Sequence, residues 1–261
     1  LPIALDHQSY LGDTLEAIGF EKAGILRGNG TLVLADPEPP NSILAEAARL
    51  GCRVMQIGQA FDWVDGEVSW MAVEERQSLT LPSAETCLPS GSLAAAVQAM
   101  AALGLLQPSS VPQLCNLSLL GRLTRVDLAQ QRLYLDVAHN PQAVVRLAVE
   151  LSRKGCSRIR VVFGLYADKD AQAIIAAISP LVHFWHLTQV NEARALPAEQ
   201  LFSCLPASHQ ARAETSVSVQ QALGNAIRSS AGIDTIVVFG SFPVVGEALE
   251  YLDFQSGARL Q

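Results

Sequence analysis

Two residue groups near the start of the sequence could do chemistry. Asp6 and His7 end an apolar, strand-like segment, the position at which α/β proteins bind ligands. In the helix expected next, Leu15, Ile18 and Lys22 stand at positions i, i+3 and i+7, so the spacing predicts a lysine on the core-facing stripe. Such a lysine either extends its charge to solvent near the helix end or meets a partner, which Asp6 and His7 could supply. A histidine in this place is also compatible with a purely structural role.

A second group lies in the middle of the sequence. Asp136 and His139 follow an alternating apolar segment, and Asn140 with Pro141 supplies an N-cap and a first helical residue. The two side chains are expected at the carboxyl end of a strand, where an open α/β sheet binds ligands, although they could equally form the turn itself. Arg122, in a Gly-Arg-Leu sequence, is a positive fork suited to phosphate groups or, alternatively, a solvated linker arginine.

The elements that position these residues alternate between strand and helix patterns. Residues 107–121 carry two prolines and several small polar residues, which indicates a domain boundary near Gly121. Before it, the patterns predict a helix over 14–23 with Asp13 as N-cap and Glu16 completing a capping box, strands over 31–35 and 53–57, helices over 42–50 and 93–103, and a β-hairpin over 61–81 around Asp65-Gly66.

After this boundary the pattern restarts. The segments RLYLDVAHNP, RIRVVFGLYADKD, LVHFWHLTQV and DTIVVFGSFP each begin with an apolar strand, and all but the third run directly into helix-starting residues. Strands that alternate with helices are typical of an α/β fold with a mainly parallel sheet. The sequence therefore predicts two domains, residues 1–121 and residues 122–261.

The composition narrows the class of protein. The 261 residues are 49% hydrophobic and 16% charged, with a formal net charge of −7. This much apolar material can fill sizeable cores, which excludes disorder as the main state. There is no block of basic residues, so neither nucleic acid nor a membrane is an expected partner. The longest apolar stretch, 93–106, is too short for a bilayer span, and the cysteines are scattered singly, so we expect a cytoplasmic protein.

Several motifs taken together resemble one family. LDHQSYLGDTLEAIGFEKAGI, GRL, LDVAHNP, ADKD and FGSF resemble, in this order and at compatible spacing, the folylpolyglutamate synthase/dihydrofolate synthase branch of the Mur ligase family. The resemblance implies the C-terminal part of a P-loop-type central domain followed by a Rossmann-like C-terminal domain. It also implies an ATP-dependent ligase of folate biosynthesis, which activates a carboxyl group of dihydropteroate or folate as an acyl phosphate and joins L-glutamate to it.

The resemblance further implies roles for single residues. His7 would bind Mg²⁺, and Lys22 would be carbamylated by carbon dioxide, which turns the cation into an oxygen ligand for the metal. An apolar environment would favour this step, because only the neutral amine reacts with carbon dioxide. Arg122 and Asp136 would bind ATP, and His139 would lie near the same interdomain site as a catalytic residue.

Other positions would complete this site. Where relatives have an asparagine at the start of the alanine-rich helix, this chain has Ser92, which could cap the helix but reaches less far toward the nucleotide. The turn at residues 168–170 and the step from Gly240 to Ser241 could complete the cleft, with Ser241 a candidate for contact with glutamate.

The sequence contains no G-x-x-x-x-G-K-[ST] loop for ATP phosphates. We therefore expect it to correspond to the C-terminal three-fifths of a synthetase and to be inactive alone. The alternatives are another Mur-type ligase, acting on a cell-wall precursor, and a noncatalytic Rossmann-like binding module. The E-K-A-G-I and D-V-A-H-N-P blocks favour the folate branch. They do not distinguish dihydrofolate synthase, folylpolyglutamate synthase and a bifunctional enzyme, nor do they fix the oligomeric state, for which a monomer is the simplest expectation.

Overall fold

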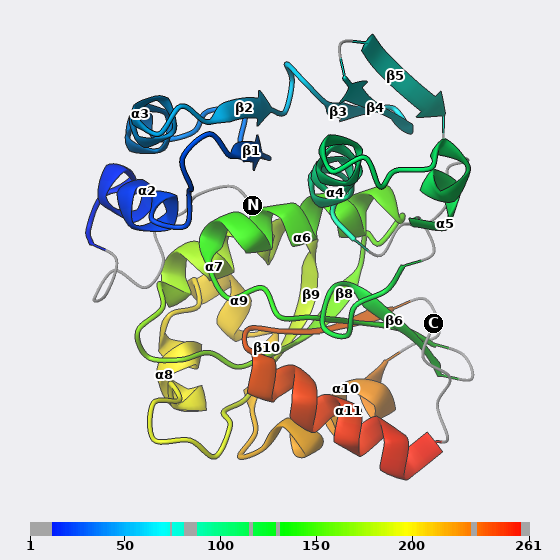
Figure 1. Cartoon of the computed structure of the whole chain (residues 1–261). Helices are drawn as coiled ribbons and strands as arrows, with labels where there is room; N and C mark the ends of the chain where they lie inside the picture. Colours follow the sequence, from blue (N-terminus) through cyan, green and yellow to red (C-terminus); the bar gives the residue numbers. More distant parts are fainter. Residues whose placement is uncertain are drawn as a thin grey trace. The chain divides into compact units, whose positions relative to one another are not determined.

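The chain folds into two compact units, Leu1–Leu117 and Ser118–Gln261. The computed structural model describes residues 12–73, 75–80, 88–114, 117–128, 131–230 and 234–256 (Figure 1). Both units combine helices with strands, so the predicted α/β class is confirmed.

The first unit contains a two-stranded parallel sheet, β1-β2, and a three-stranded antiparallel sheet, β3-β4-β5. Its described elements are α2 (Leu15–Ala23), β1 (Thr31–Leu34), α3 (Asn41–Arg49), β2 (Arg53–Gln56), β3 (Asp62–Val64), β4 (Glu67–Ala72), β5 (Glu75–Thr80), α4 (Ser90–Ala102), the 3₁₀ turn η1 (Pro108–Ser110) and α5 (Val111–Leu114).

The hairpin predicted around Asp65-Gly66 is present. Val64 pairs with Glu67, and the two residues between them have φ values of 49° and 83°, as a two-residue turn of the I′ type requires. The buried face of this sheet packs against α4, where Trp70 and Val97 are buried.

The start of α2 differs from the predicted capping box. Thr14, rather than Asp13, is the N-cap, and its hydroxyl oxygen accepts from the backbone N–H three residues on. The Glu16 carboxylate caps a different helix: it accepts from the backbone N–H groups of Ser42 (2.7 Å) and Asn41 (2.9 Å) at the start of α3. These hydrogen bonds hold the pKa of Glu16 below its ordinary value. The local pattern could not indicate that a second helix would compete for this side chain.

The second unit is a six-stranded sheet with the order β10-β9-β8-β11-β7-β6, parallel except for the antiparallel pair β6-β7. The four strands predicted after the boundary are β7, β8, β9 and β11. The described elements are β6 (Thr124–Leu128), β7 (Gln131–Asp136), α6 (Pro141–Arg153), β8 (Ile159–Phe163), α7 (Ala171–Ile178), the 3₁₀ turn η2 (Ser179–Leu181), β9 (Val182–Leu187), α8 (Ala198–Ser203), α9 (Ala207–Gln210), β10 (Ala213–Thr215), α10 (Val219–Ser229), β11 (Thr235–Phe239) and α11 (Phe242–Ser256).

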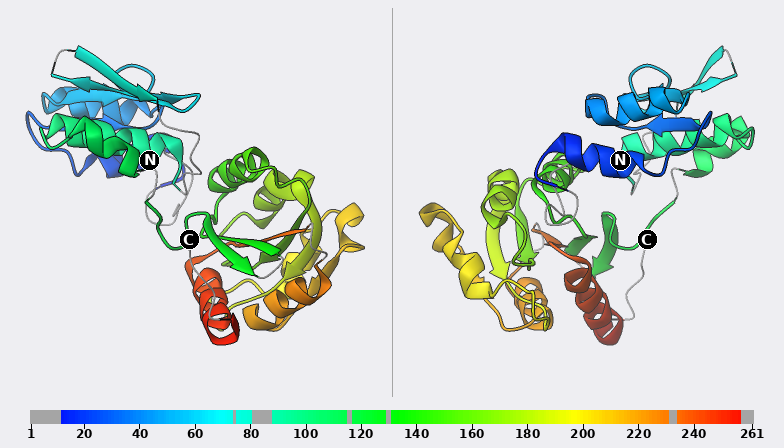
Figure 2. Two further views of the ribbon diagram at one scale, coloured as in Figure 1. Left: turned by 90° about the vertical axis from the view of Figure 1, so that its right-hand side faces the viewer. Right: turned by 60° about the vertical axis from the view of Figure 1, so that its left-hand side comes forward.

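Helices cover both faces of this sheet. Residues of α6 and α7 share one core cluster with the strands, and residues of α10 and α11 share the other (Figure 2). A strand covered on both faces can be apolar throughout, and all five residues of β11 are buried. Polar residues at the strand ends are thus left to meet solvent or ligands. Within the described part of the chain, no helix is long and apolar enough to cross a membrane.

Candidate functional site

The site is built at the end of the six-stranded sheet where the parallel strands β7, β8 and β11 finish, which we call the carboxyl edge. Asp136 is the last residue of β7 and pairs in register with Phe239, the last residue of β11. Each carboxylate oxygen of Asp136 accepts one backbone hydrogen bond, Oδ2 from Leu123 N–H (2.8 Å) and Oδ1 from Ala138 N–H (2.8 Å). A carboxylate offers about four lone-pair sites, so each oxygen can accept one further donor.

The Gly121-Arg122-Leu123 turn is fixed against the end of β7. Gly121 donates its N–H to the Thr124 hydroxyl (3.0 Å) and accepts from the N–H of Val137 (2.9 Å). Leu123 has a φ of 46°, an uncommon value for a leucine, and the hydrogen bond from its N–H to Asp136 accompanies it. Arg122 itself is exposed, with its backbone held and its guanidinium group on the surface. The structure thus brings together Arg122 and Asp136, which the sequence places fourteen residues apart.

Charges around Asp136 act in opposite directions. Burial raises the pKa of Asp136, and the N–H groups of Leu123 and Ala138, with the charges of Arg122 and Arg146, offset this only in part. Burial also lowers the pKa of the Arg146 guanidinium, which the Asp136 charge counteracts and the nearby Arg122 reinforces. Two arginines and one aspartate therefore share this edge, an excess of positive charge suited to an anionic ligand.

His139 follows the same strand and is oriented by its own backbone. Its Nδ1 lies 2.7 Å from the carbonyl oxygen of Val137. A carbonyl oxygen can only accept, so Nδ1 carries the hydrogen and Nε2 is the unprotonated nitrogen of the neutral ring. Asn140 is the N-cap of α6, with its side chain accepting from Ala143 N–H (2.9 Å), which confirms the predicted helix start.

Ser241 is buried in the turn after β11. Its Oγ lies 3.4 Å from the N–H of Val244, a long contact at the start of α11. The preceding Gly240 has a φ of 123°, and a Cβ at this position would lie 2.0 Å from the carbonyl oxygen of Gly164. Only glycine fits, and the turns after β8 and β11 therefore lie in direct backbone contact. In the structure, Ser241 therefore has a structural role in the turn between β11 and α11.

The turn at residues 168–170 ends the loop after β8 and begins α7. Asp170 is the N-cap of this helix and accepts from Ala173 N–H (2.9 Å). Lys169 lies 3.2 Å from the Asp168 carboxylate, and the lysine side chain is only 8% exposed. The turn therefore supports the helix start directly.

The structure corrects the prediction that Lys22 faces the core. Lys22 is exposed and Leu15 is 46% exposed, so only Ile18 of the predicted stripe is buried. The remaining buried positions of α2 are Gly19 and Ala23. The cause is tertiary: Pro40 and Ser42 at the start of α3 pack so closely on Gly19 that a Cβ there would lie 2.6 Å from the serine Oγ. The burial argument for carbamylation of Lys22 thereby loses its basis.

The other two candidates of the first unit contribute less to the described geometry. Ser92 lies within the first turn of α4 and does not cap it; the N-cap is Pro89, which makes no side-chain cap. The prediction that Ser92 could cap this helix is therefore wrong. Asp6 and His7 lie outside the described residues. In the part of the chain described, no three His, Cys, Asp or Glu side chains are grouped so that they could hold a metal ion, and we derive no step through a metal.

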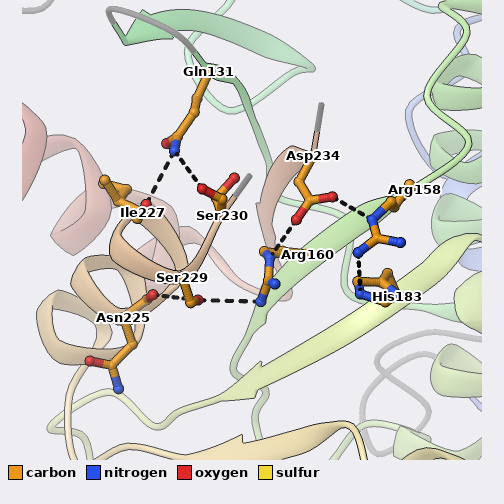
Figure 3. Close-up of polar contacts among 9 residues, drawn as sticks. All are labelled: Gln131, Arg158, Arg160, His183, Asn225, Ile227, Ser229, Ser230 and Asp234. Carbon is orange, nitrogen blue, oxygen red and sulfur yellow. Dashed lines mark hydrogen bonds and ion pairs between the residues drawn. The ribbon is translucent and has the colours of Figure 1, made fainter. Parts of the chain in front are cut away.

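A second polar cluster lies at the opposite end of the sheet, where β8 and β11 begin, which we call the amino edge (Figure 3). The Asp234 side chain is fully buried and accepts from the Nε atoms of Arg158 (2.6 Å) and Arg160 (2.7 Å). Arg158 also donates to His183 Nε2 (2.7 Å), and Arg160 donates to the Ser229 hydroxyl (3.2 Å). Burial would raise the pKa of Asp234, but the hydrogen bonds from the two arginines hold it below its ordinary value. Its charge is neutralised within the protein, so this cluster has a structural role.

Two residues of the carboxyl edge were missed by the sequence analysis. Arg146 lies outside the buried stripe of α6, formed by Val144, Leu147 and Leu151, so the pattern treats it as a solvated charge. Phe242, the first residue of α11, is 63% exposed, although an aromatic residue after an apolar strand is expected in the core. The FGSF block drew attention to this turn but not to the exposed ring.

Comparisons with known proteins find relatives that are similar to this chain over most of its length. Residues 121–242 match the family described as "Mur ligase, glutamate ligase domain". A dihydrofolate synthase/folylpolyglutamate synthase of Escherichia coli (strain K12) is 30% identical over 96% of this chain and 58% of that protein. The structure of E. coli FolC in complex with DHPP and ADP superposes with a TM-score of 0.87 at 28% identity, over 97% of this chain and 60% of that one.

A second solved structure gives the same result. A bifunctional folylpolyglutamate synthase/dihydrofolate synthase with Mn, AMPPNP and L-glutamate bound has a TM-score of 0.82 and 32% identity, over 97% of this chain and 60% of that one. The chain spans about 60% of the length of the curated relatives it matches, the share that the motif comparison predicted. The chain therefore carries the glutamate ligase domain of the Mur ligase family, and over most of its length it is similar to dihydrofolate synthase/folylpolyglutamate synthases.

Proposed function

We propose that the chain is part of an ATP-dependent ligase that joins L-glutamate to dihydropteroate, to the glutamate tail of folates, or to both. The relatives carry this activity in their names, and two of their structures hold ADP or AMPPNP. The observation that carries the proposal is the Asp136 carboxylate, which two backbone N–H groups fix beside two arginines inside the glutamate ligase domain. The first unit would be the C-terminal portion of the ATP-binding domain.

The reaction has two steps. The γ-phosphoryl group of ATP passes to the acceptor carboxylate, which gives an acyl phosphate and ADP. The amine of glutamate then attacks the acyl carbon, forms the amide and releases phosphate. Negative charge gathers on the phosphate oxygens in the first step, and positive charge on the attacking amine in the second.

The residues of the carboxyl edge are suited to these two needs. Arg122 would neutralise phosphate charge, with Arg146 adding to the local positive potential. Asp136, whose oxygens can each accept one more donor, would orient a hydroxyl or amine group of the nucleotide. His139 has an unprotonated Nε2 in its neutral form and would take the proton that the amine must lose. Ser241 and Ser92 stay proposed contacts for glutamate and nucleotide.

The decisive experiment compares the complete ligase with this chain alone. We expect the complete enzyme to form ADP and the glutamylated product in equal amounts, with dihydropteroate, tetrahydrofolate or both as acceptor. The chain alone, which has no P-loop sequence, is expected to show no glutamate-dependent ATP hydrolysis. A complete enzyme that glutamylates only a cell-wall precursor would identify another Mur-type ligase. Nucleotide binding without amide formation would identify a binding module.

Lys22 stays the proposed site of a carbamate in the complete enzyme, and His7 the proposed ligand of Mg²⁺. The lysine is exposed at the end of α2 and is accessible to carbon dioxide. ¹³C-bicarbonate should give a carbamate NMR signal that is lost in Lys22→Ala and kept in Lys154→Ala. A signal that persists in Lys22→Ala would assign the carbamate to another lysine.

A further inference from the structure

Phe242 is an exposed aromatic residue that lies near the charged side chain of Arg122. Phe242 is the first residue of α11. It is 63% exposed, so much of its apolar surface does not gain the free energy of burial. The guanidinium carbon of Arg122 lies 5.9 Å from the ring centroid, within the range at which a cation is attracted to an aromatic face. The ring therefore lies next to Arg122, the side chain that we propose binds the nucleotide phosphates.

The backbone that carries the ring is rigid. Gly240 lies so close to the carbonyl oxygen of Gly164 that no side chain fits there, and the following Ser241 is buried. Phe242 comes directly after this pair, so the direction of its Cα–Cβ bond is set by the end of the sheet.

The backbone that carries Arg122 is fixed against the same helix. A Cβ added to Gly121 would lie 2.7 Å from a methyl carbon of Val137 and 3.7 Å from one of Val245, which stands on the first turn of α11. The hydrogen bonds of Gly121 and Leu123 hold both sides of Arg122. The backbone of Arg122 is therefore fixed, while its side chain can still rotate, and Phe242 is within reach of that side chain.

We propose that Phe242 is a positioning residue, which holds the Arg122 guanidinium in the orientation that receives a nucleotide phosphate. An arginine side chain loses rotamer entropy when it is fixed, and a preformed contact reduces the free energy that nucleotide binding must supply. The proposal rests on the proposed function of Arg122.

The test is a set of variants of the complete ligase, examined for ADP affinity by calorimetry and for the KM of ATP. Phe242→Leu keeps an apolar side chain but removes the ring face, and should weaken ADP binding about two- to fivefold. Phe242→Trp should retain wild-type affinity, because tryptophan offers the best cation-binding face. In an Arg122→Ala background, Phe242→Leu should have no further effect.

A matched control removes a similar contact far from the site. Phe184→Leu takes away the ring under Arg160 (5.2 Å), at the opposite edge of the sheet, and should leave ADP affinity unchanged. The inference is overturned if Phe242→Leu binds ADP like the wild type, if Phe242→Trp loses as much as Phe242→Leu, or if Phe242→Leu costs the same with and without Arg122. If Arg122→Ala alone leaves nucleotide affinity unchanged, the proposed function of Arg122 fails instead, and the two failures are distinguishable.

Discussion

The two edges of the second unit's sheet each carry a desolvated aspartate, and the two aspartates have different hydrogen-bond partners. Asp234, at the amino edge, is fully buried and directly paired with two guanidinium groups. Asp136, at the carboxyl edge, accepts two backbone N–H groups, while its arginine neighbours act on it through their charges. The pKa of Asp234 is lowered and that of Asp136 is raised. A closed ion pair stabilises the fold, whereas a fixed carboxylate beside exposed positive charge can receive a ligand.

The largest expected effect is the loss of the amino-edge ion pair. Asp234→Ala would leave Arg160, whose side chain is 11% exposed, without its carboxylate, and breaking such a buried pair costs about 3–5 kcal/mol. Denaturant unfolding, followed through hydrogen exchange of β8 and β11 amides, would measure this. The control is Asp127→Ala, because the Asp127 carboxylate is 38% exposed and its pairing with Arg125 is worth at most about 1 kcal/mol. Equal losses in both variants would contradict the structural role of the amino-edge cluster.

The carboxyl edge should instead affect the reaction. In the complete ligase, alanine at Arg122, Asp136 or His139 should lower kcat more than it raises the KM for folate. Each charge-assisted contact is worth about 1.5–3 kcal/mol, or roughly one to two powers of ten in rate. Asp136→Asn keeps an acceptor but loses the charge. Full activity in Asp136→Asn together with unfolding in Asp136→Ala would show that Asp136 only forms the turn.

The two aspartates should also give opposite pH dependence of stability. The lowered pKa of Asp234 means that its contribution is complete above the ordinary value of 3.8 and is lost as the pH falls through the folded-state pKa. The raised pKa of Asp136 means that its contribution is complete below 3.8 and is lost as the pH rises through the folded-state pKa. Unfolding of the wild type, Asp234→Asn and Asp136→Asn between about pH 3 and 6 measures both. Slopes of the same sign would refute the contrast.

The smallest expected effect concerns Arg146. Removing its charge in Arg146→Ala should raise the pKa of Asp136 further, because the Arg146 charge opposes the rise that burial causes. NMR titration of the carboxyl carbons would detect this. Arg153→Ala is the matched control, since Arg153 lies on the same helix, is 64% exposed and pairs with Glu150. An equal shift in both variants would remove Arg146 from the site.

Local patterns in the sequence were sufficient for four of the six strands in the sheet of the second unit, but not for β6 and β10. Asn140 with Pro141 predicted the start of α6, because capping depends on residues that are neighbours in the chain. The hairpin at Asp65-Gly66 was predicted for the same reason. The positions of Asp136 and His139 at a strand's carboxyl end followed from the alternation of the strand itself.

Contacts between distant segments were decided only by the tertiary structure. The exposure of Lys22 depends on how α3 packs against Gly19, and the capping role of Glu16 depends on the same helix. The raised pKa of Asp136 depends on burial, on the turn at Leu123 and on Arg146, none of which its own strand encodes. Periodicity reports which face of an element is apolar. It cannot report which other element covers that face or which charges that element brings, because these follow from packing between residues far apart in the chain.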